Sequence, residues 1–211
     1  LHALQHRGQE GAGIAACENG QLLCRKGRGL LSDALSREDI ALLTGESAIG
    51  HVRYSTQGGD EPENLLPLTA RLGTGMIAAA HNGQIVNAWE LRQKLEEQGS
   101  ILYGTSDSEI LLHLIQREKG HLTQKILAAC RHLEGAFAFV ILSENSLFAV
   151  RDKNGLRPLV VGKLGDGWCV ASESCALEAV GATFLRDVQP GELLKFSSEG
   201  LTSFHYTEDT A

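Results

Sequence analysis

Five short segments place polar residues and glycines where the surrounding chain is apolar, and their side chains could do chemistry. Arg53 ends an apolar run, and its planar guanidinium could hold a carboxylate through two parallel hydrogen bonds. Asp107 lies near the start of an expected helix, where it could bind an ammonium group. Taken singly, each has a simpler interpretation: an arginine paired with a surface acid, and an acid favoured by the helix dipole.

The pair Asn82-Gly83 follows a strongly apolar run and also has two interpretations. An Asn-Gly pair after a strand is typical of a hairpin turn. Alternatively, the Asn82 side-chain amide and the Gly83 backbone N–H could stabilise a developing oxyanion. The turn is the simpler interpretation of the pair alone. Both can hold together, because a tight turn presents its N–H groups outward.

The remaining polar positions are interpreted as structural. The segment 151–159 predicts a turn, after which Arg157-Pro158 begins an edge strand. His6, His51 and His81 lack the spacing of metal ligands, so each is expected to be a structural histidine with its hydrogen bonds satisfied. The sequence therefore predicts no metal site.

Composition and charge exclude several classes of protein. The 211 residues are 43% hydrophobic and 21% charged, which is typical of one globular domain. A net charge of -7 argues against a nucleic-acid partner. There is no apolar run of membrane-spanning length and no signal peptide, so no membrane association is expected. The five cysteines include no CxxC pair, which favours reduced thiols and a cytoplasmic location.

Short apolar runs separated by turn residues predict a largely β chain. Turns at Glu144-Asn145 and Gly165-Asp166-Gly167 are expected to join antiparallel strands. The expected strands are residues 21–25, 48–54, 76–81, 136–142, 147–151, 159–162, 168–172, 192–196 and 201–204.

Three central helices are expected between these strands. Asn87 and Ser106 each precede a helical apolar pattern and have a glutamate three residues later, which predicts two capping boxes. A third helix is expected over residues 123–133, with short ones in the first few residues and after Ser174. Clustered helices between two groups of strands indicate an α+β fold with antiparallel sheets, arranged as a layered sandwich with helices outside.

Taken together, the polar segments resemble a class II glutamine amidotransferase domain, a member of the N-terminal-nucleophile (Ntn) hydrolases. The resemblance runs from Leu1 to about Phe204, and its order and spacing are similar to the amidophosphoribosyltransferase branch of that family. The glucosamine-6-phosphate synthase branch has similar Arg, Asn-Gly and Asp motifs with different neighbours. The matching segments are LQHRGQEGAGI, GHVRYSTQG, HNGQIVN, TSDSE, RDKNGLRPL and SESCAL.

The resemblance implies a four-layer αββα sandwich of two antiparallel sheets. It also implies a mechanism in which an N-terminal cysteine, with its own α-amino group as base, attacks the side-chain amide of glutamine. Ammonia leaves, and water then hydrolyses the γ-glutamyl thioester.

Matched residue by residue, the resemblance implies that Arg53 binds the α-carboxylate of glutamine and that Asp107 binds its α-ammonium group. Asn82 and Gly83 are implied to form the oxyanion hole. Thr56 is implied to border the same pocket. The resemblance further implies that Arg7 and Gly8 support the region around the nucleophile.

The sequence departs from the family in two respects. No cysteine stands at position 1, and none of the five cysteines matches the nucleophile. The phosphoribosyltransferase domain is also absent from these residues. We therefore expect residues 1–211 to be one domain, with a strand and loop bearing the nucleophile before residue 1. A phosphoribosyltransferase domain is expected after residue 211. The implied partners are L-glutamine in this domain and phosphoribosyl pyrophosphate, with magnesium and in some members an iron–sulfur cluster, in the further one. No cofactor is expected in this domain, and the intact protein is expected to be a homo-oligomer.

The function that the resemblance implies is glutamine hydrolysis that supplies ammonia to phosphoribosyl pyrophosphate, which yields 5-phosphoribosylamine in the first step of purine synthesis. The 211 residues alone are expected to be inactive. Two alternatives stay open at this point. One is a catalytically inactive domain kept for binding or assembly, and the other is the glutaminase domain of a different class II amidotransferase.

Overall fold

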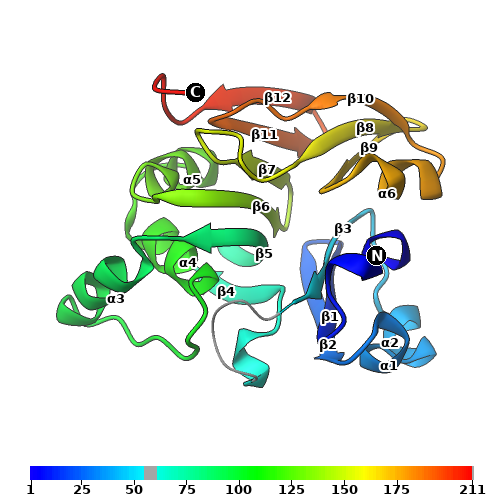
Figure 1. The fold of residues 1–211 in the computed structure, drawn as a ribbon, viewed down its shortest axis with the longest axis horizontal. Helices are drawn as coiled ribbons and strands as arrows, with labels where there is room; N and C mark the ends of the chain where they lie inside the picture. Colours follow the sequence, from blue (N-terminus) through cyan, green and yellow to red (C-terminus); the bar gives the residue numbers. More distant parts are fainter. Residues whose placement is uncertain (55–60, 211) are drawn as a thin grey trace.

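The computed structural model describes residues 1–54 and 61–210, which fold into layers of antiparallel sheet and helix (Figure 1). The strands are β1 Gly11–Glu18, β2 Gln21–Arg28, β3 Ser47–Arg53, β4 Leu68–Leu72, β5 Gly75–Ile85, β6 Gly135–Ser143, β7 Leu147–Arg151, β8 Val160–Leu164, β9 Gly167–Ala171, β10 Thr183–Asp187, β11 Glu192–Ser197 and β12 Gly200–His205. The α-helices are α1 Leu31–Ala34, α2 Arg37–Leu42, α3 Ala88–Glu97, α4 Ser108–Arg117, α5 Leu122–Cys130 and α6 Ser174–Ala179. Two 3₁₀ helices, η1 His2–Arg7 and η2 Pro62–Asn64, complete the set.

The largest sheet has six strands in the order β12-β11-β7-β6-β5-β4, and every neighbouring pair is antiparallel. Helices α3, α4 and α5 lie together on one side of it (Figure 1). Helix α4 directs Ile110, Leu111 and Ile115 into the core, where they are inaccessible to solvent. These residues meet Phe137 and Phe139 of the sheet in one apolar cluster. Burial of this apolar surface is the main stabilising force of the layer pair.

Two three-stranded sheets, in the orders β2-β1-β3 and β10-β8-β9, form the layer on the other face of the large sheet. Helix α1 packs against β1 and β2, and α6 packs against β9 and β10. The expected order of helix, sheet, sheet and helix is therefore confirmed. The second layer is divided into two sheets, whereas one continuous sheet was expected. The division lies between the edge strands β3 and β9, which face each other without pairing (Figure 1).

The sequence analysis did not predict strands β1, β4 and β10, α-helices α1 and α2, or the 3₁₀ helix η2. Strand β1 contains mainly glycine and alanine, without the β-branched and aromatic residues that mark strands. Small side chains there leave room for the segment that leads into β4. At Gly13, for example, an added methyl carbon would lie 2.3 Å from the Leu66 carbonyl oxygen.

The prediction of a turn at Asn82-Gly83 is wrong. Both residues lie within β5, where Asn82 pairs with Ala138 and Gly83 with Phe137 of β6. Gly83 has a φ of 143°, and an added methyl carbon would lie 2.0 Å from the Ala136 carbonyl oxygen. The glycine thus permits close approach of the neighbouring strand, and pairing with β6 prevails over the local turn preference.

Both predicted capping boxes are also wrong, although both helices exist. The Asn87 side chain bonds outside its helix, to the backbone of His132 and Glu134. Helix α4 starts at Ser108, so its N-cap is Asp107 and not the expected Ser106, and no described side chain caps it. The Ser106 hydroxyl accepts a 3.2 Å hydrogen bond from the Ser108 N–H. The glutamate three residues later reaches a preceding loop instead.

The segment 151–159 is architectural, as predicted, and Asp152 organises it. The Asp152 carboxylate is fully buried and accepts hydrogen bonds from four backbone N–H groups at 3.0–3.3 Å. A turn forms at Gly155, which has a φ of 62°.

The prediction of an edge strand at Arg157-Pro158 is wrong, because β8 is the central strand of its sheet. Pro158 lies just before that strand and therefore costs no ladder hydrogen bond.

Replacing Asp152 with alanine is expected to lower the free energy of unfolding by about 4 kcal/mol, because it leaves buried N–H groups without acceptors. Asp209→Ala is the matched control. That carboxylate is exposed and pairs with Lys153 at the surface, so its removal is expected to change stability by less than about 0.5 kcal/mol. Denaturant unfolding of both variants measures the difference. Equal stability of the two would contradict the organising role of Asp152.

In the described part of the chain, no helix has both the length and the apolar character that crossing a membrane requires.

Candidate active site

A cavity of about 340 Å³ lies where the two sheet layers meet. Residues of η1, β3 and β5 line it, together with the segment that begins α4 and the loop after β9. Five residues singled out in the sequence are among those that line it: Arg7, Arg53, Asn82, Gly83 and Asp107. Thus motifs far apart in the sequence meet around one space. Thr56, by contrast, lies outside the described residues.

Arg53 is the last residue of β3, and its side chain is buried, with 7% of the residue exposed. Gly8 packs directly against its backbone: a methyl carbon at Gly8 would lie 2.4 Å from the Arg53 carbonyl carbon. Gly8 therefore does not line the cavity but allows η1 to lie against β3. Its neighbour Arg7 does line the cavity and pairs with Glu173 beside α6. This ion pair joins η1 to the element that follows β9.

Asp107 supplies the carboxylate of the cavity, immediately before α4. Its Oδ2 accepts a 2.9 Å hydrogen bond from the Ile85 backbone N–H, and its Oδ1 lies 3.5 Å from His81 Nδ1. Burial alone would raise the pKa of Asp107, but the interactions with His81, Ile85 and Ser108 outweigh it and hold the pKa below its usual range. The group is therefore an anion at neutral pH and can bind a cation.

Two histidines lie beside these charges. His81 stacks on Phe139, with ring centroids 4.3 Å apart, and its Nδ1 lies 3.0 Å from the Ser108 hydroxyl. Its Nε2, like Nδ1 of His51, is buried with no hydrogen-bond partner among the described residues. Burial lowers the pKa of His51 to about 4, so this imidazole is neutral at neutral pH. The prediction that both histidines are fully satisfied structural residues is therefore wrong.

Asn82 offers a hydrogen-bond donor to the cavity. Its side-chain Nδ2 is buried and has no acceptor within the described ranges 1–54 and 61–210. Buried amide groups are nearly always paired, so a buried and unpaired donor in a cavity is suited to an oxygen atom of a ligand. Gly83 follows directly, in a backbone conformation that favours glycine. The pair combines a side-chain amide with a neighbouring peptide group, as an oxyanion site requires.

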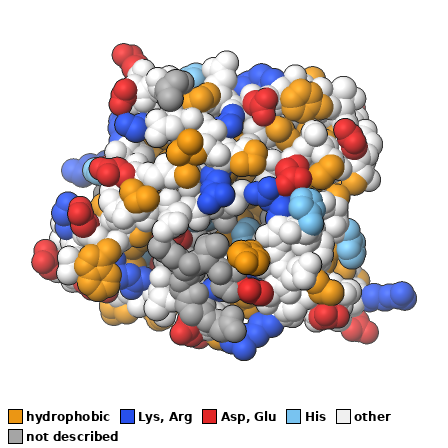
Figure 2. All heavy atoms as spheres, in the orientation of Figure 1, with side chains coloured by type: hydrophobic (Ala, Val, Ile, Leu, Met, Phe, Trp, Pro, Cys, Tyr) orange, Lys and Arg blue, Asp and Glu red, His pale blue; other side chains and the backbone are white. Residues whose placement is uncertain are grey.

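Sequence reasoning missed Arg157, which lines the same cavity. Its Nε is buried without a partner among the residues described, and its backbone N–H is held by Asp152. The architectural segment thereby delivers an arginine to the cavity. Figure 2 shows one face of the molecule, and basic and histidine side chains gather near the middle of that face. Three arginines and one aspartate are among the described residues that line the cavity, which favours a ligand that carries a carboxylate.

The five cysteines are free thiols, and none belongs to the described lining of the cavity. Burial raises the pKa of each thiol, to about 12 for Cys130. Cys175 is exposed, and its proximity to Glu173 also raises its pKa. A reactive cysteine instead has a lowered pKa, so these thiols have the opposite character.

Comparison with known proteins agrees with this geometry. Residues 51–179 match the family described as a glutamine amidotransferase domain. The matched range contains Arg53, Asn82, Gly83 and Asp107. The chain therefore belongs to the glutamine amidotransferase domain family.

Within that family, the chain is similar to amidophosphoribosyltransferases, as its motifs predicted. It is 49% identical to the amidophosphoribosyltransferase of Bacillus subtilis (strain 168) over 98% of this chain and 44% of the relative. It is 42% identical to that of Staphylococcus aureus (strain MRSA252) over 100% of this chain and 43% of the relative. The chain thus spans less than half the length of these curated relatives.

A solved structure shows the same fold. It is the glutamine phosphoribosylpyrophosphate amidotransferase from B. subtilis complexed with ADP and GMP. The TM-score is 0.95 at 46% identity, and the match covers 100% of this chain and 46% of the other. The similarity therefore extends over the whole chain and over less than half of the solved one.

Proposed function

We propose that this domain binds free glutamine and hydrolyses its side-chain amide. Arg53 holds the α-carboxylate and Asp107 holds the α-ammonium group, which selects a free amino acid over a glutamine within a peptide. Asn82 and Gly83 stabilise the oxyanion that forms on the side-chain amide. The observation that supports this most strongly is that a buried arginine, an ionised aspartate and an unpaired amide donor line one cavity.

The nucleophile in this proposal is an N-terminal cysteine on a segment outside these 211 residues. This part of the proposal is supported by the raised pKa of all five thiols and by their absence from the cavity lining that is described. The facing edges of β3 and β9 have backbone groups to which a further strand could pair. Such a strand would continue the second layer beside the cavity and place its cysteine there.

The chemistry follows from these positions. The thiolate attacks the amide carbon, and the negative charge moves to the amide oxygen, which faces Asn82 and Gly83. The C–N bond breaks as the α-ammonium group of the cysteine gives its proton to the leaving nitrogen, and ammonia departs. Water then hydrolyses the thioester to release glutamate and the free thiol.

For the intact protein, we propose amidophosphoribosyl transfer. The ammonia reacts at a separate domain with phosphoribosyl pyrophosphate, and 5-phosphoribosylamine forms. The similarity to amidophosphoribosyltransferases over the whole chain supports this reaction more than that of another class II amidotransferase. We place this protein in the cytoplasm, as a homo-oligomer that needs no cofactor in the present domain.

Measurement of ammonia release from glutamine tests the proposal. The full-length protein is expected to release ammonia and to form 5-phosphoribosylamine when phosphoribosyl pyrophosphate is present. Replacement of its N-terminal cysteine with alanine is expected to abolish release, and the 211-residue chain alone is expected to show none. Turnover by that chain would show that the nucleophile lies within it. A full-length protein without glutaminase activity would contradict the proposed reaction itself.

A further inference from the structure

Asn64, at the end of η2, is almost fully buried and lines the cavity, although no sequence motif marked it. Its Oδ1 accepts hydrogen bonds from the backbone N–H groups of Thr105 (2.9 Å) and Ser106 (3.0 Å). Its Nδ2 donates to the Thr105 hydroxyl (2.8 Å) and to Glu61 Oε2 (2.9 Å). All the hydrogen-bonding positions of this amide are therefore used, and most of them hold the chain immediately before Asp107.

Glu109 holds the preceding part of the same segment. Its Oε1 accepts from the Tyr103 N–H at 2.8 Å, and its Oε2 accepts from the Gly104 N–H at 2.9 Å. Arg92 of α3 donates to the Gly104 carbonyl at 2.7 Å and lies 4.0 Å from Glu109. Glu109 is also buried, so these bonds are protected from water.

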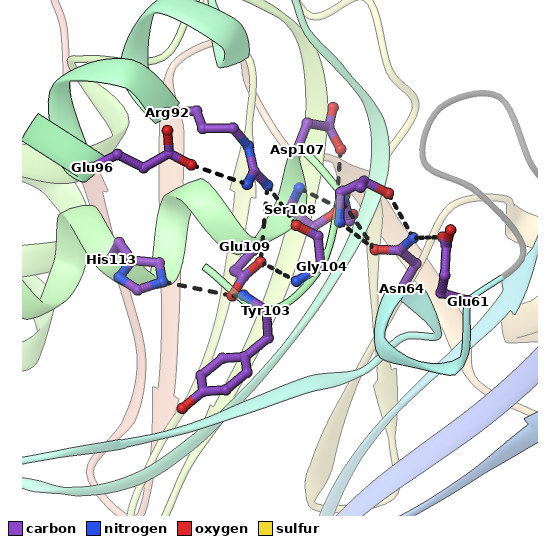
Figure 3. Close-up of polar contacts among 12 residues, drawn as sticks. Glu61, Asn64, Arg92, Glu96, Tyr103, Gly104, Asp107, Ser108, Glu109 and His113 are labelled. Atoms are coloured by element: carbon purple, nitrogen blue, oxygen red, sulfur yellow. Dashed lines mark hydrogen bonds and ion pairs between the residues drawn. The ribbon is translucent and has the colours of Figure 1, made fainter. Parts of the chain in front are cut away.

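Two buried side chains thus fix four successive backbone N–H groups, those of residues 103–106. Figure 3 shows Asn64 and Glu109 approaching this segment from two directions. The fit is close, because a methyl carbon at Gly104 would lie 2.6 Å from Asn64 Oδ1. We call Asn64, Glu109 and the segment 103–106 the aspartate clamp. Unclamped loop segments sample many conformations, so these bonds restrict where the following residue can lie.

We infer that the aspartate clamp positions Asp107 for the α-ammonium group of the substrate, with Asn64 as the residue that couples the clamp to the cavity wall. This inference rests on the proposed function, because it assumes that Asp107 binds that group. Asn64 suits this task because η2 belongs to the connection between β3, which ends in Arg53, and β4. A single amide therefore links the part of the chain after the carboxylate-binding residue to the part before the ammonium-binding residue.

A positioning role differs from a purely structural one in its effect on substrate discrimination. If Asn64 positions Asp107, its loss weakens only the contribution of the α-ammonium group. Glutaramic acid, which is glutamine without its α-amino group, cannot use that contribution. The specific measurement is therefore the ratio of kcat/KM for glutamine to kcat/KM for glutaramic acid. Because both substrates are measured on one preparation, loss of folded enzyme cancels in the ratio.

In the full-length enzyme, Asn64→Ala is expected to lower this ratio by roughly tenfold, the effect of weakening one charge-assisted hydrogen bond. Glu109→Gln, which keeps the side-chain shape but replaces one acceptor oxygen, is expected to lower it in the same direction. Asn145→Ala is the matched control, since Asn145 is exposed in the β6–β7 hairpin and is not among the described residues that line the cavity. It is expected to leave the ratio unchanged.

Asp107→Asn separates failure of this inference from failure of the proposed function. A fall in the ratio for Asp107→Asn with no change for Asn64→Ala and Glu109→Gln would overturn the clamp and leave glutamine binding intact. An unchanged ratio for Asp107→Asn would overturn the role of Asp107, and the inference with it. A fall in the ratio for Asp107→Asn and both clamp variants, but not for Asn145→Ala, is the expected result.

Discussion

Arg53→Ala in the full-length protein is expected to raise the KM for glutamine by roughly a hundredfold while kcat changes little, because two charge-assisted hydrogen bonds to the α-carboxylate are lost. Arg53 is buried at the end of β3, so its interaction with a carboxylate is only weakly screened by water. The carboxylate is the same in the ground state and the transition state. Loss of the arginine therefore weakens binding of the substrate and of the transition state equally, and this appears as a higher KM.

The control for this experiment is Arg71→Ala. Arg71 is an exposed arginine of β4, so its removal changes the net charge equally without touching the cavity. Glutaminase kinetics over a wide range of glutamine concentrations measure both variants. An unchanged KM for Arg53→Ala, or an equal rise in the control, would contradict carboxylate binding by Arg53. Arg53→Lys is expected to recover only part of the loss, because an ammonium group cannot form the bidentate pair.

Asn82→Ala is expected to lower kcat by about a hundredfold to a thousandfold with little change in KM, the usual effect of removing one oxyanion donor. Nδ2 of Asn82 is buried without an acceptor in the described part of the protein. It is therefore already free of competing bonds when negative charge develops on the substrate. A neutral carbonyl in the ground state gains much less from this donor than the oxyanion does, so the effect falls on kcat.

Asn154→Ala is the matched control for Asn82→Ala. Asn154 is an exposed residue of the turn beside Asp152 and is not among the described residues around the cavity. Steady-state kinetics of both variants, together with their thermal unfolding, separate lost catalysis from lost stability. If Asn82→Ala raised KM and left kcat unchanged, the amide would bind ground-state substrate and the oxyanion assignment would be wrong.

These two substitutions are expected to act on different steps, and the structure gives the reason. Arg53 belongs to β3 of the second layer, whereas Asn82 belongs to β5 of the large sheet. In the proposed binding mode, the α-carboxylate of the substrate lies against β3 of the second layer, and its reacting amide lies against β5 of the large sheet. Their effects on kcat/KM are expected to add in the double variant, because well-separated sites are nearly independent.

Local sequence chemistry predicted the parts of the fold that depend on local contacts. The hairpins β6–β7 and β8–β9 follow turn residues, because asparagine, aspartate and glycine tolerate the backbone angles of tight turns. The helices α3, α4 and α5 follow the periodicity of their apolar residues. Strand β1 was missed for the same reason, since its buried residues are mainly glycine and alanine and lack a strand signal.

Asn82-Gly83 shows where local reasoning fails. The dipeptide favours a turn by itself, but β6 pairs with β5 through both residues and overrides that preference. Glu109 is similar: its spacing from Ser106 predicted a capping box, yet its carboxylate binds two N–H groups of a preceding loop. In each case the competing partner lies elsewhere in the fold, so no window of sequence contains it.

The sequence by itself determined which chemical groups this protein has: an arginine, an aspartate and an asparagine–glycine pair in motifs similar to those of glutamine amidotransferases. Only the tertiary structure decided that these groups meet around one cavity, that His81 and Arg157 join them, and that Asn64 holds the chain before Asp107. The physical reason is that motifs record local chemistry. A binding site depends on contacts between distant segments, which form only when the sheet layers pack together.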